Sequence, residues 1–165
     1  MGNYVPTLGG SCANDIRPSL YDYQVDDIQG KPFDIAAMRG KVLLISNFTS
    51  MHRKYADRGF EVLAFPCKQF ANQEFDTAAE VLSFVEKYGA KFPMMQFVDV
   101  NGKHTHPVYQ YLKRHSSLFK GGKKLQGIQW NFGKFLVDKR GDVVEYFPPS
   151  VQPITLTEQI EELLD

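Results

Sequence analysis

The sequence has little cysteine, no net charge and no long apolar run, and each absence removes a class of protein. Of the 165 residues only Cys12 and Cys67 are cysteines, too few for a disulfide framework or a cysteine-rich zinc site. The 19 basic residues balance the 19 acidic ones, so bulk charge gives no reason to expect nucleic acid or an anionic membrane as a partner. No stretch approaches the roughly 18 apolar residues of a membrane-spanning helix. The default expectation is a soluble cytoplasmic protein.

The opening residues also lack the basic region followed by an apolar one that marks a signal peptide. They are rich in Gly, Ser, Asn and Pro, and we expect residues 1–18 to form a flexible arm. The rest of the chain, residues 19–165, has the composition and length of one globular domain, with 43% apolar and 23% charged residues overall.

The order of predicted elements indicates an α/β fold. Two short strands lie within 20–35, and buried strands are expected at 41–48 and 61–66, a further strand at 96–100 and a hairpin at 134–147. A short crossover at 49–60 and helices within 77–93, 106–115 and 155–165 separate or follow them. Strands and helices alternate in the first part of the chain, and a hairpin follows near the end. This order predicts a central mixed sheet with helices on both faces and a short N-terminal hairpin.

Two capping boxes are predicted at helix starts. Thr77 pairs with Glu80 in the first, and Thr155 pairs with Glu158 in the second. In the helix that follows Thr77, apolar residues recur on one face, which is typical of an amphipathic helix: Val81, Phe84, Val85 and Tyr88.

Three stretches contain residues that packing alone does not explain. The loop "FPCKQFANQEF", 65–75, follows a buried strand, and ligands of open α/β sheets gather at the carboxyl ends of strands. The stretch "IQWNFGKF", 128–135, places the only tryptophan beside an asparagine just before a strand. The third stretch is the brief crossover at 49–60.

These residues resemble the signatures of the glutathione peroxidase family, whose fold is thioredoxin-like. The family's "FPCNQFGGQEP" is similar to the loop at 65–75, and its "WNF" is intact at 130–132. The family's "NVAS" is similar to "NFTS" at 47–50. The resemblance covers about residues 19–165.

The resemblance implies an oxidoreductase that reduces hydrogen peroxide and organic or lipid hydroperoxides in the response to oxidative stress. A cysteine or selenocysteine of the family attacks the peroxide, together with Gln, Trp and Asn residues that match Gln73, Trp130 and Asn131. Their N–H groups would stabilise a thiolate or selenolate and orient the peroxide oxygen. The family needs no cofactor, and glutathione or a thioredoxin-type protein reduces the enzyme.

The residue that should attack the peroxide is absent. Against the family pattern about 14 residues, including the nucleophile and the first half of a helix, are missing between Ser50 and Met51. Only twelve residues, 49–60, then remain for a crossover between parallel strands, which usually takes about a dozen or more. They leave about two turns of helix, with Met51 and Tyr55 as its only large apolar residues, and such a helix would cover the sheet poorly.

Three explanations stay open. The native product contains a segment that this sequence lacks, for instance through an unread selenocysteine codon or a skipped exon. Alternatively, the chain is a catalytically inactive thioredoxin-fold protein that binds a partner or senses redox state. In the third case Cys67 has replaced the nucleophile, although a thiol at the end of a buried strand is usually inert.

The remaining expectations concern partners. The stretch 84–92 lacks the resolving cysteine of thioredoxin-dependent members, which favours a small thiol as reductant over a protein. No long insertion precedes Trp130, which favours a monomer. Lys123 and Lys124 are weak candidates for binding an anionic substrate or lipid head group. His104 and His106 have no third ligand at metal spacing, so we expect no metal site.

Overall fold

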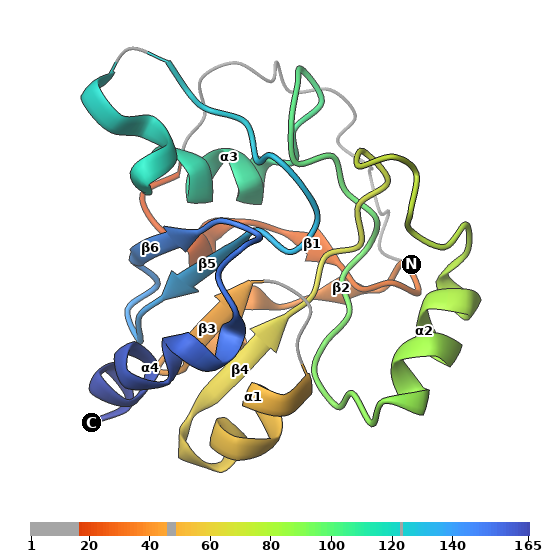
Figure 1. Ribbon diagram of the computed structural model, residues 1–165, viewed down its shortest axis with the longest axis horizontal. Coiled ribbons are helices and arrows are strands. Elements are labelled where there is room, and N and C mark those ends of the chain that lie inside the picture. The colour runs from red at the N-terminus through yellow and green to blue at the C-terminus, as the bar shows by residue number, and fades with distance from the viewer. Residues whose placement is uncertain (1–16, 46–48, 123) are drawn as a thin grey trace, which may run out of the picture.

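The computed structural model describes residues 17–45, 49–122 and 124–165, with a four-stranded mixed sheet at the centre (Figure 1). Its strands are β3 (Val42–Ile45), β4 (Phe60–Leu63), β5 (Lys134–Val137) and β6 (Val143–Phe147), in the order β4-β3-β5-β6. β3 and β4 are parallel, whereas β5 is antiparallel to β3 and to β6. A separate hairpin of β1 (Val25–Asp26) and β2 (Pro32–Phe33) confirms the predicted N-terminal pair.

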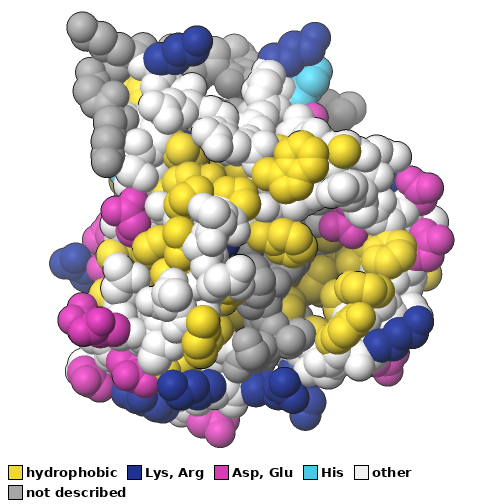
Figure 2. All heavy atoms as spheres, viewed as in Figure 1, with side chains coloured by type: hydrophobic (Ala, Val, Ile, Leu, Met, Phe, Trp, Pro, Cys, Tyr) yellow, Lys and Arg dark blue, Asp and Glu magenta, His cyan; other side chains and the backbone are white. Residues whose placement is uncertain are grey.

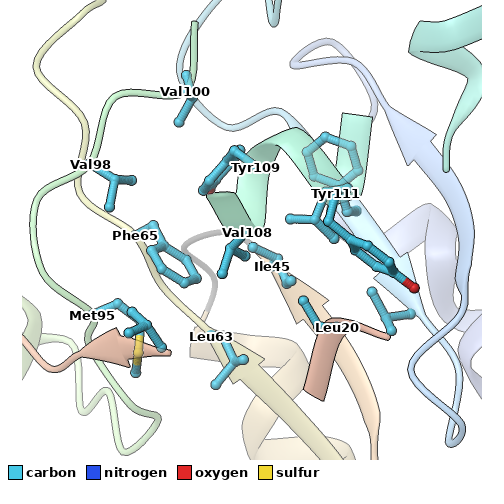
Figure 3. Packing of buried hydrophobic residues seen from close by; sticks show 14 of the residues in the cluster. Leu20, Ile45, Leu63, Phe65, Met95, Val98, Val100, Val108, Tyr109 and Tyr111 are labelled. Carbon is cyan, nitrogen blue, oxygen red and sulfur yellow. The ribbon is translucent and has the colours of Figure 1, made fainter. Parts of the chain in front are cut away.

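Helices cover both faces of the sheet, as the sequence predicts. In β3 the side chains alternate: Leu43 and Ile45 join the cluster packed under α3 (Pro107–Arg114), where Figure 3 shows residues from β3, β4 and α3 converging. Val42 and Leu44 join the opposite cluster with α1 (Thr49–Tyr55) and α4 (Thr157–Leu164). Successive side chains of β3 point to opposite faces of the sheet, and both faces are covered. The strand is therefore a continuous apolar run in the sequence.

The helix α2 (Ala78–Lys87) stands at the end of the sheet, beside the loop that follows β4 (Figure 1). Its capping box is present: Thr77 N donates to Glu80 Oε2 at 3.0 Å, and Glu80 N donates to Thr77 Oγ1 at 3.3 Å. On its apolar face only Val81 is buried, whereas Phe84 is 43% and Tyr88 is 60% exposed. The face predicted from the sequence therefore exists but is largely left open.

Two local predictions are wrong. Residues 96–100 form no strand; only Met94 and Met95, before them, make isolated bridges to Ala64 and Asp27. The second capping box is also absent, because a 3₁₀ turn, Pro153–Leu156, precedes the helix and α4 begins at Thr157. Within that turn the Thr155 hydroxyl donates to Gln152 O at 2.7 Å instead of capping α4.

The crossover between β3 and β4 contains the short helix predicted for it. In α1 the side chains of Met51 and Tyr55 are 2% and 1% exposed and fill the core beside β4. His52 adds a contact that the sequence did not suggest, since its Nε2 lies 2.8 Å from Glu61 Oε1 on β4. The sequence predicted that such a short helix would cover the sheet poorly. In the structure both large apolar side chains are buried, and the contact between His52 and Glu61 adds to the packing of α1 against β4.

Of the expected arm at residues 1–18, positions 1–16 lie outside the described residues. Arg17 N donates to the Tyr23 hydroxyl at 2.9 Å, so the described chain is already packed against the domain at this point. None of the helices in the described ranges is long and apolar enough to cross a membrane.

Candidate functional site

Three strand ends meet at one edge of the sheet. The last residue of β3, Ile45, pairs with Leu63, the last residue of β4, and also with Phe135 near the start of β5. The loop that follows β4 and the loop that precedes β5 therefore begin and end at the same edge. The residues that follow β3 in the chain also start here.

A groove of about 580 Å³ opens between these loops and α2. Cys67, Gln73, Trp130 and Asn131 are among the residues that line it. The α2 side supplies an aromatic row in which the ring centroids of Phe75 and Phe84, and of Phe84 and Tyr88, are 5.1 and 5.0 Å apart. Figure 2 shows hydrophobic side chains gathered around a hollow on this face of the molecule.

The structure brings Gln73, Trp130 and Asn131 together, as the resemblance implies. Asn131 Nδ2 donates to Gln73 Oε1 at 3.1 Å, which joins the two loops directly. The Trp130 ring lies 6.0 Å from that of Phe70 and remains 47% exposed. Two amides and an indole N–H thus stand together at the mouth of an apolar groove, which suits them to bind a small polar group there.

Backbone strain is concentrated beside these residues. Within the described part of the chain, the non-glycine residues with positive φ are Ala71 and Asn72, both at 51°, and Phe132 at 66°. Ala71 and Asn72 directly precede Gln73, and Phe132 directly follows Asn131. The left-handed conformation costs an L-residue roughly 1–2 kcal/mol, and such strain tends to occur at functional sites.

A buried lysine holds the second loop, and sequence reasoning missed it. Lys134 is 0% exposed, and its Nζ donates to the carbonyl of Phe132 at 2.6 Å and to that of Pro148 at 3.4 Å. Burial lowers the pKa of the Lys134 ammonium. The sequence contained a sign of this role. A lysine that begins the apolar strand "KFLV" is expected to be buried, and a buried ammonium needs hydrogen-bond acceptors such as carbonyls.

Cys67 lines the groove but is poorly suited to attack a peroxide. It is 8% exposed, and its Sγ lies 3.8 Å from Gln69 Oε1. Burial raises the pKa of the Cys67 thiol, so the thiolate is disfavoured at neutral pH. Gln69 fixes the loop, because its Oε1 accepts from the N–H groups of Val100 and Asn101 at 2.8 and 2.9 Å.

The lysine candidates gain no support. Lys123 lies outside the described residues, and Lys124 is exposed and does not line the groove. His106 is half-buried, and its Nδ1 accepts from Val108 N at 3.3 Å as the N-cap of α3. Across the residues that the structure describes, no group of three or more His, Cys, Asp or Glu side chains is placed to hold a metal ion.

A mixed sheet in this strand order, with helices on both faces, defines a protein of thioredoxin-like fold, and a polar cluster lies where its parallel strands end. The comparisons name the family: the glutathione peroxidase model matches residues 20–113. The T. cruzi protein GPX1 is a solved structure with a TM-score of 0.69 and 34% identity, matched over 88% of this chain and 96% of that one. The chain belongs to the glutathione peroxidase family.

Curated plant proteins are similar at a comparable level. A mitochondrial Arabidopsis thaliana protein, named as a probable phospholipid hydroperoxide glutathione peroxidase, is 43% identical over 88% of this chain and 68% of its own length. Glutathione peroxidase 1 of Helianthus annuus is 40% identical over 92% of this chain and 98% of its own length. The sunflower alignment has 167 positions, but 92% of 165 residues is about 152, so about 15 of its positions have no counterpart here. That number is close to the about 14 residues that the family pattern predicts to be absent between Ser50 and Met51.

Proposed function

We propose that this chain has the fold and the peroxide-binding groups of a thiol-dependent hydroperoxide reductase, acting on hydrogen peroxide and on organic or lipid hydroperoxides. The observation that supports it most is the pair formed by Gln73 and Asn131 beside Trp130, at the edge where β3 ends. The names of the plant relatives support the same reaction.

The proposed reaction has two parts. A thiolate or selenolate attacks one peroxide oxygen, the O–O bond breaks, and the other oxygen leaves as an alcohol or water after taking a proton. Two small thiols then reduce the resulting sulfenic or selenenic acid, release water and become a disulfide. The N–H groups of Gln73, Asn131 and Trp130 would hold the chalcogenate and the leaving oxygen, where negative charge develops.

The nucleophile is proposed to lie in a segment between Ser50 and Met51 of the native product. That segment would follow Ser50, at the start of α1, five residues after β3 ends beside the loops that carry the three N–H groups. Cys67 is buried and its thiol pKa is raised, which argues against its taking over. The 165-residue chain itself should therefore turn over hydroperoxide at background.

The partners follow the same proposal. A small thiol such as glutathione is favoured as reductant, because within the described residues Cys67 is the only cysteine and no second thiol stands ready to exchange with a protein. A monomeric cytoplasmic protein that acts in the oxidative stress response remains the proposal from the sequence. The domain is proposed to span residues 19–165.

The first test is the intact mass of the protein from its natural source. At the mean residue mass of this chain, 18.8 kDa over 165 residues, fourteen further residues add about 1.6 kDa. A heavier product supports the missing segment. A mass that matches the printed chain favours the inactive binding or sensing protein instead.

The second test restores the segment. Inserting the corresponding residues of the sunflower relative, with a cysteine nucleophile, between Ser50 and Met51 should raise peroxidase turnover with glutathione or thioredoxin well above that of the printed chain. A Cys→Ser change within the insert is the matched control. Turnover by the printed chain that disappears in Cys67→Ser would contradict the proposal and favour the substituted thiol.

A further inference from the structure

A second hollow, of about 350 Å³, lies on the other side of the loop that leads to Trp130. Its ten lining residues include Asn101, Lys103, Gln110, Lys113, Arg114 and Gln126. Asn101 separates it from the groove: its side-chain amide bonds the carbonyl and the N–H of Ile128, a groove residue, at 2.8 and 2.9 Å. The volume far exceeds the roughly 30 Å³ that one water molecule occupies in the liquid.

The charge of this pocket is one-sided. Three of the ten lining residues, Lys103, Lys113 and Arg114, are cations, and none is an acid. No ion pair of these three occurs among the residues that the structure describes. Such a concentration of positive charge raises the local concentration of anions.

Lys113 places one of these positive charges in the interior of the protein, where an unpaired charge is unfavourable. Its side chain is 3% exposed, and its Nζ donates to the carbonyl of Val100 at 2.6 Å. A neutral carbonyl does not balance the ammonium charge, and burial alone lowers the pKa of Lys113. A buried charge is normally paired, yet no carboxylate among the described residues pairs with Lys113.

Arg114 has an unused donor in the same place. Its Nε is buried and has no hydrogen-bond partner among the described residues, while its guanidinium lies over the Phe119 ring at 5.7 Å. A buried donor without an acceptor is rare in folded proteins and calls for a specific explanation. Because Arg114 lines the pocket, an anion there would lie close to its guanidinium and offset its charge.

We propose that this pocket binds a small oxyanion of the phosphate or carboxylate class, held by Lys103, Lys113 and Arg114. The guanidinium fork matches two oxygens of one anion, and the two ammonium groups add point charges beside it. The amides of Gln110 and Gln126 stand among the lining residues that complete the wall. This site is separate from the peroxide site and does not depend on the nucleophile.

The test is calorimetric titration of the full chain with inorganic phosphate at constant ionic strength, with chloride as the blank. We expect saturable binding that Arg114→Gln weakens at least about tenfold, since a hydrogen bond to a charged group is lost. Lys103 is exposed, so Lys103→Gln should fold normally and weaken binding less. Arg53→Gln removes an exposed arginine on α1 and is the matched control that should bind as the parent does.

A second arm separates the sources of the anion. Phosphatidylcholine vesicles with and without phosphatidic acid are tested for sedimentation of the chain. Binding to the acidic vesicles that Lys103→Gln weakens, without binding of free phosphate, assigns the oxyanion to a lipid head group. Absence of saturable binding in both arms, or equal weakening by Arg53→Gln, overturns the proposal.

Discussion

Asn131 Nδ2 donates to Gln73 Oε1 at 3.1 Å and joins two residues that stand 58 positions apart in the chain. One amide reaches this point from the loop after β4 and the other from the loop before β5. Residues with strained backbone flank the pair on both loops, and Lys134 binds a carbonyl of the loop that carries Asn131. Each of these supports leads to a measurable expectation.

The amide pair should matter for chemistry rather than for folding. In the protein with its crossover restored, Gln73→Ala should lower kcat/KM by about 10²-fold, since removing one positioned donor at a developing negative charge typically costs this much. The exposed Gln159 on α4 supplies the control Gln159→Ala, which should leave the rate unchanged. A drop below about threefold in Gln73→Ala would separate this residue from catalysis.

Ala71→Gly should stabilise the protein. Ala71 has φ of 51°, in a position where the family signature has glycine, and the left-handed strain of roughly 1–2 kcal/mol exceeds the added chain entropy of glycine. We expect the free energy of unfolding in urea to rise by about 0.5–1 kcal/mol. Ala79→Gly on the exposed side of α2 should instead lower it by about as much.

Lys134→Met should loosen the loop that presents Trp130 and Asn131. It removes the hydrogen bonds that the buried ammonium donates to the carbonyls of Phe132 and Pro148, so the free energy of unfolding should fall by about 1–3 kcal/mol. The single tryptophan reports the loop, and its fluorescence emission should change in the folded state. Lys87→Met, an exposed change on α2, should alter neither quantity. An unchanged emission in Lys134→Met would argue against a positioning role.

Cys67 should react slowly and only at high pH. With Cys12→Ser in the background, its alkylation by iodoacetamide should be slower than that of free thiols at pH 7, with a midpoint above the ordinary thiol pKa of about 8.5. The folded chain keeps this proton where the unfolded chain loses it, so the stability contributed by Cys67 falls as pH rises above the unfolded pKa. Protein unfolded in urea provides the reference rate. A midpoint below 7.5 would reopen Cys67 as a nucleophile.

Patterns that depend on a few adjacent residues were predictable from the sequence. The capping box at Thr77 and the paired buried strands depend on local chemistry and on burial of both faces, and both are present. The box at Thr155 fails because Pro153 begins a 3₁₀ turn, in which Thr155 satisfies a neighbouring carbonyl instead. The four residues of a capping box do not show whether a neighbouring turn will take up the same threonine side chain.

Features that depend on what packs where were not predictable. Periodicity placed Phe84 and Tyr88 on the apolar face of α2, but nothing among the described residues covers them fully. The predicted strand at 96–100 is replaced by scattered bonds: Val98 N donates to the Pro66 carbonyl at 3.1 Å, and Gln69 Oε1 accepts from the N–H groups of Val100 and Asn101. The resemblance, by contrast, identified Gln73, Trp130 and Asn131 as neighbours from two distant motifs, and their catalytic role stays a prediction.

The seven-residue α1 has a practical consequence for anyone who prepares this protein. Because Met51 and Tyr55 fill the core and His52 reaches Glu61, the domain closes without the residues that would supply a nucleophile. Good yield, a sharp melting transition and a well-dispersed spectrum would then describe a preparation that is folded and inert. A preparation of this chain should therefore be judged by its turnover of hydroperoxide as well as by its folding.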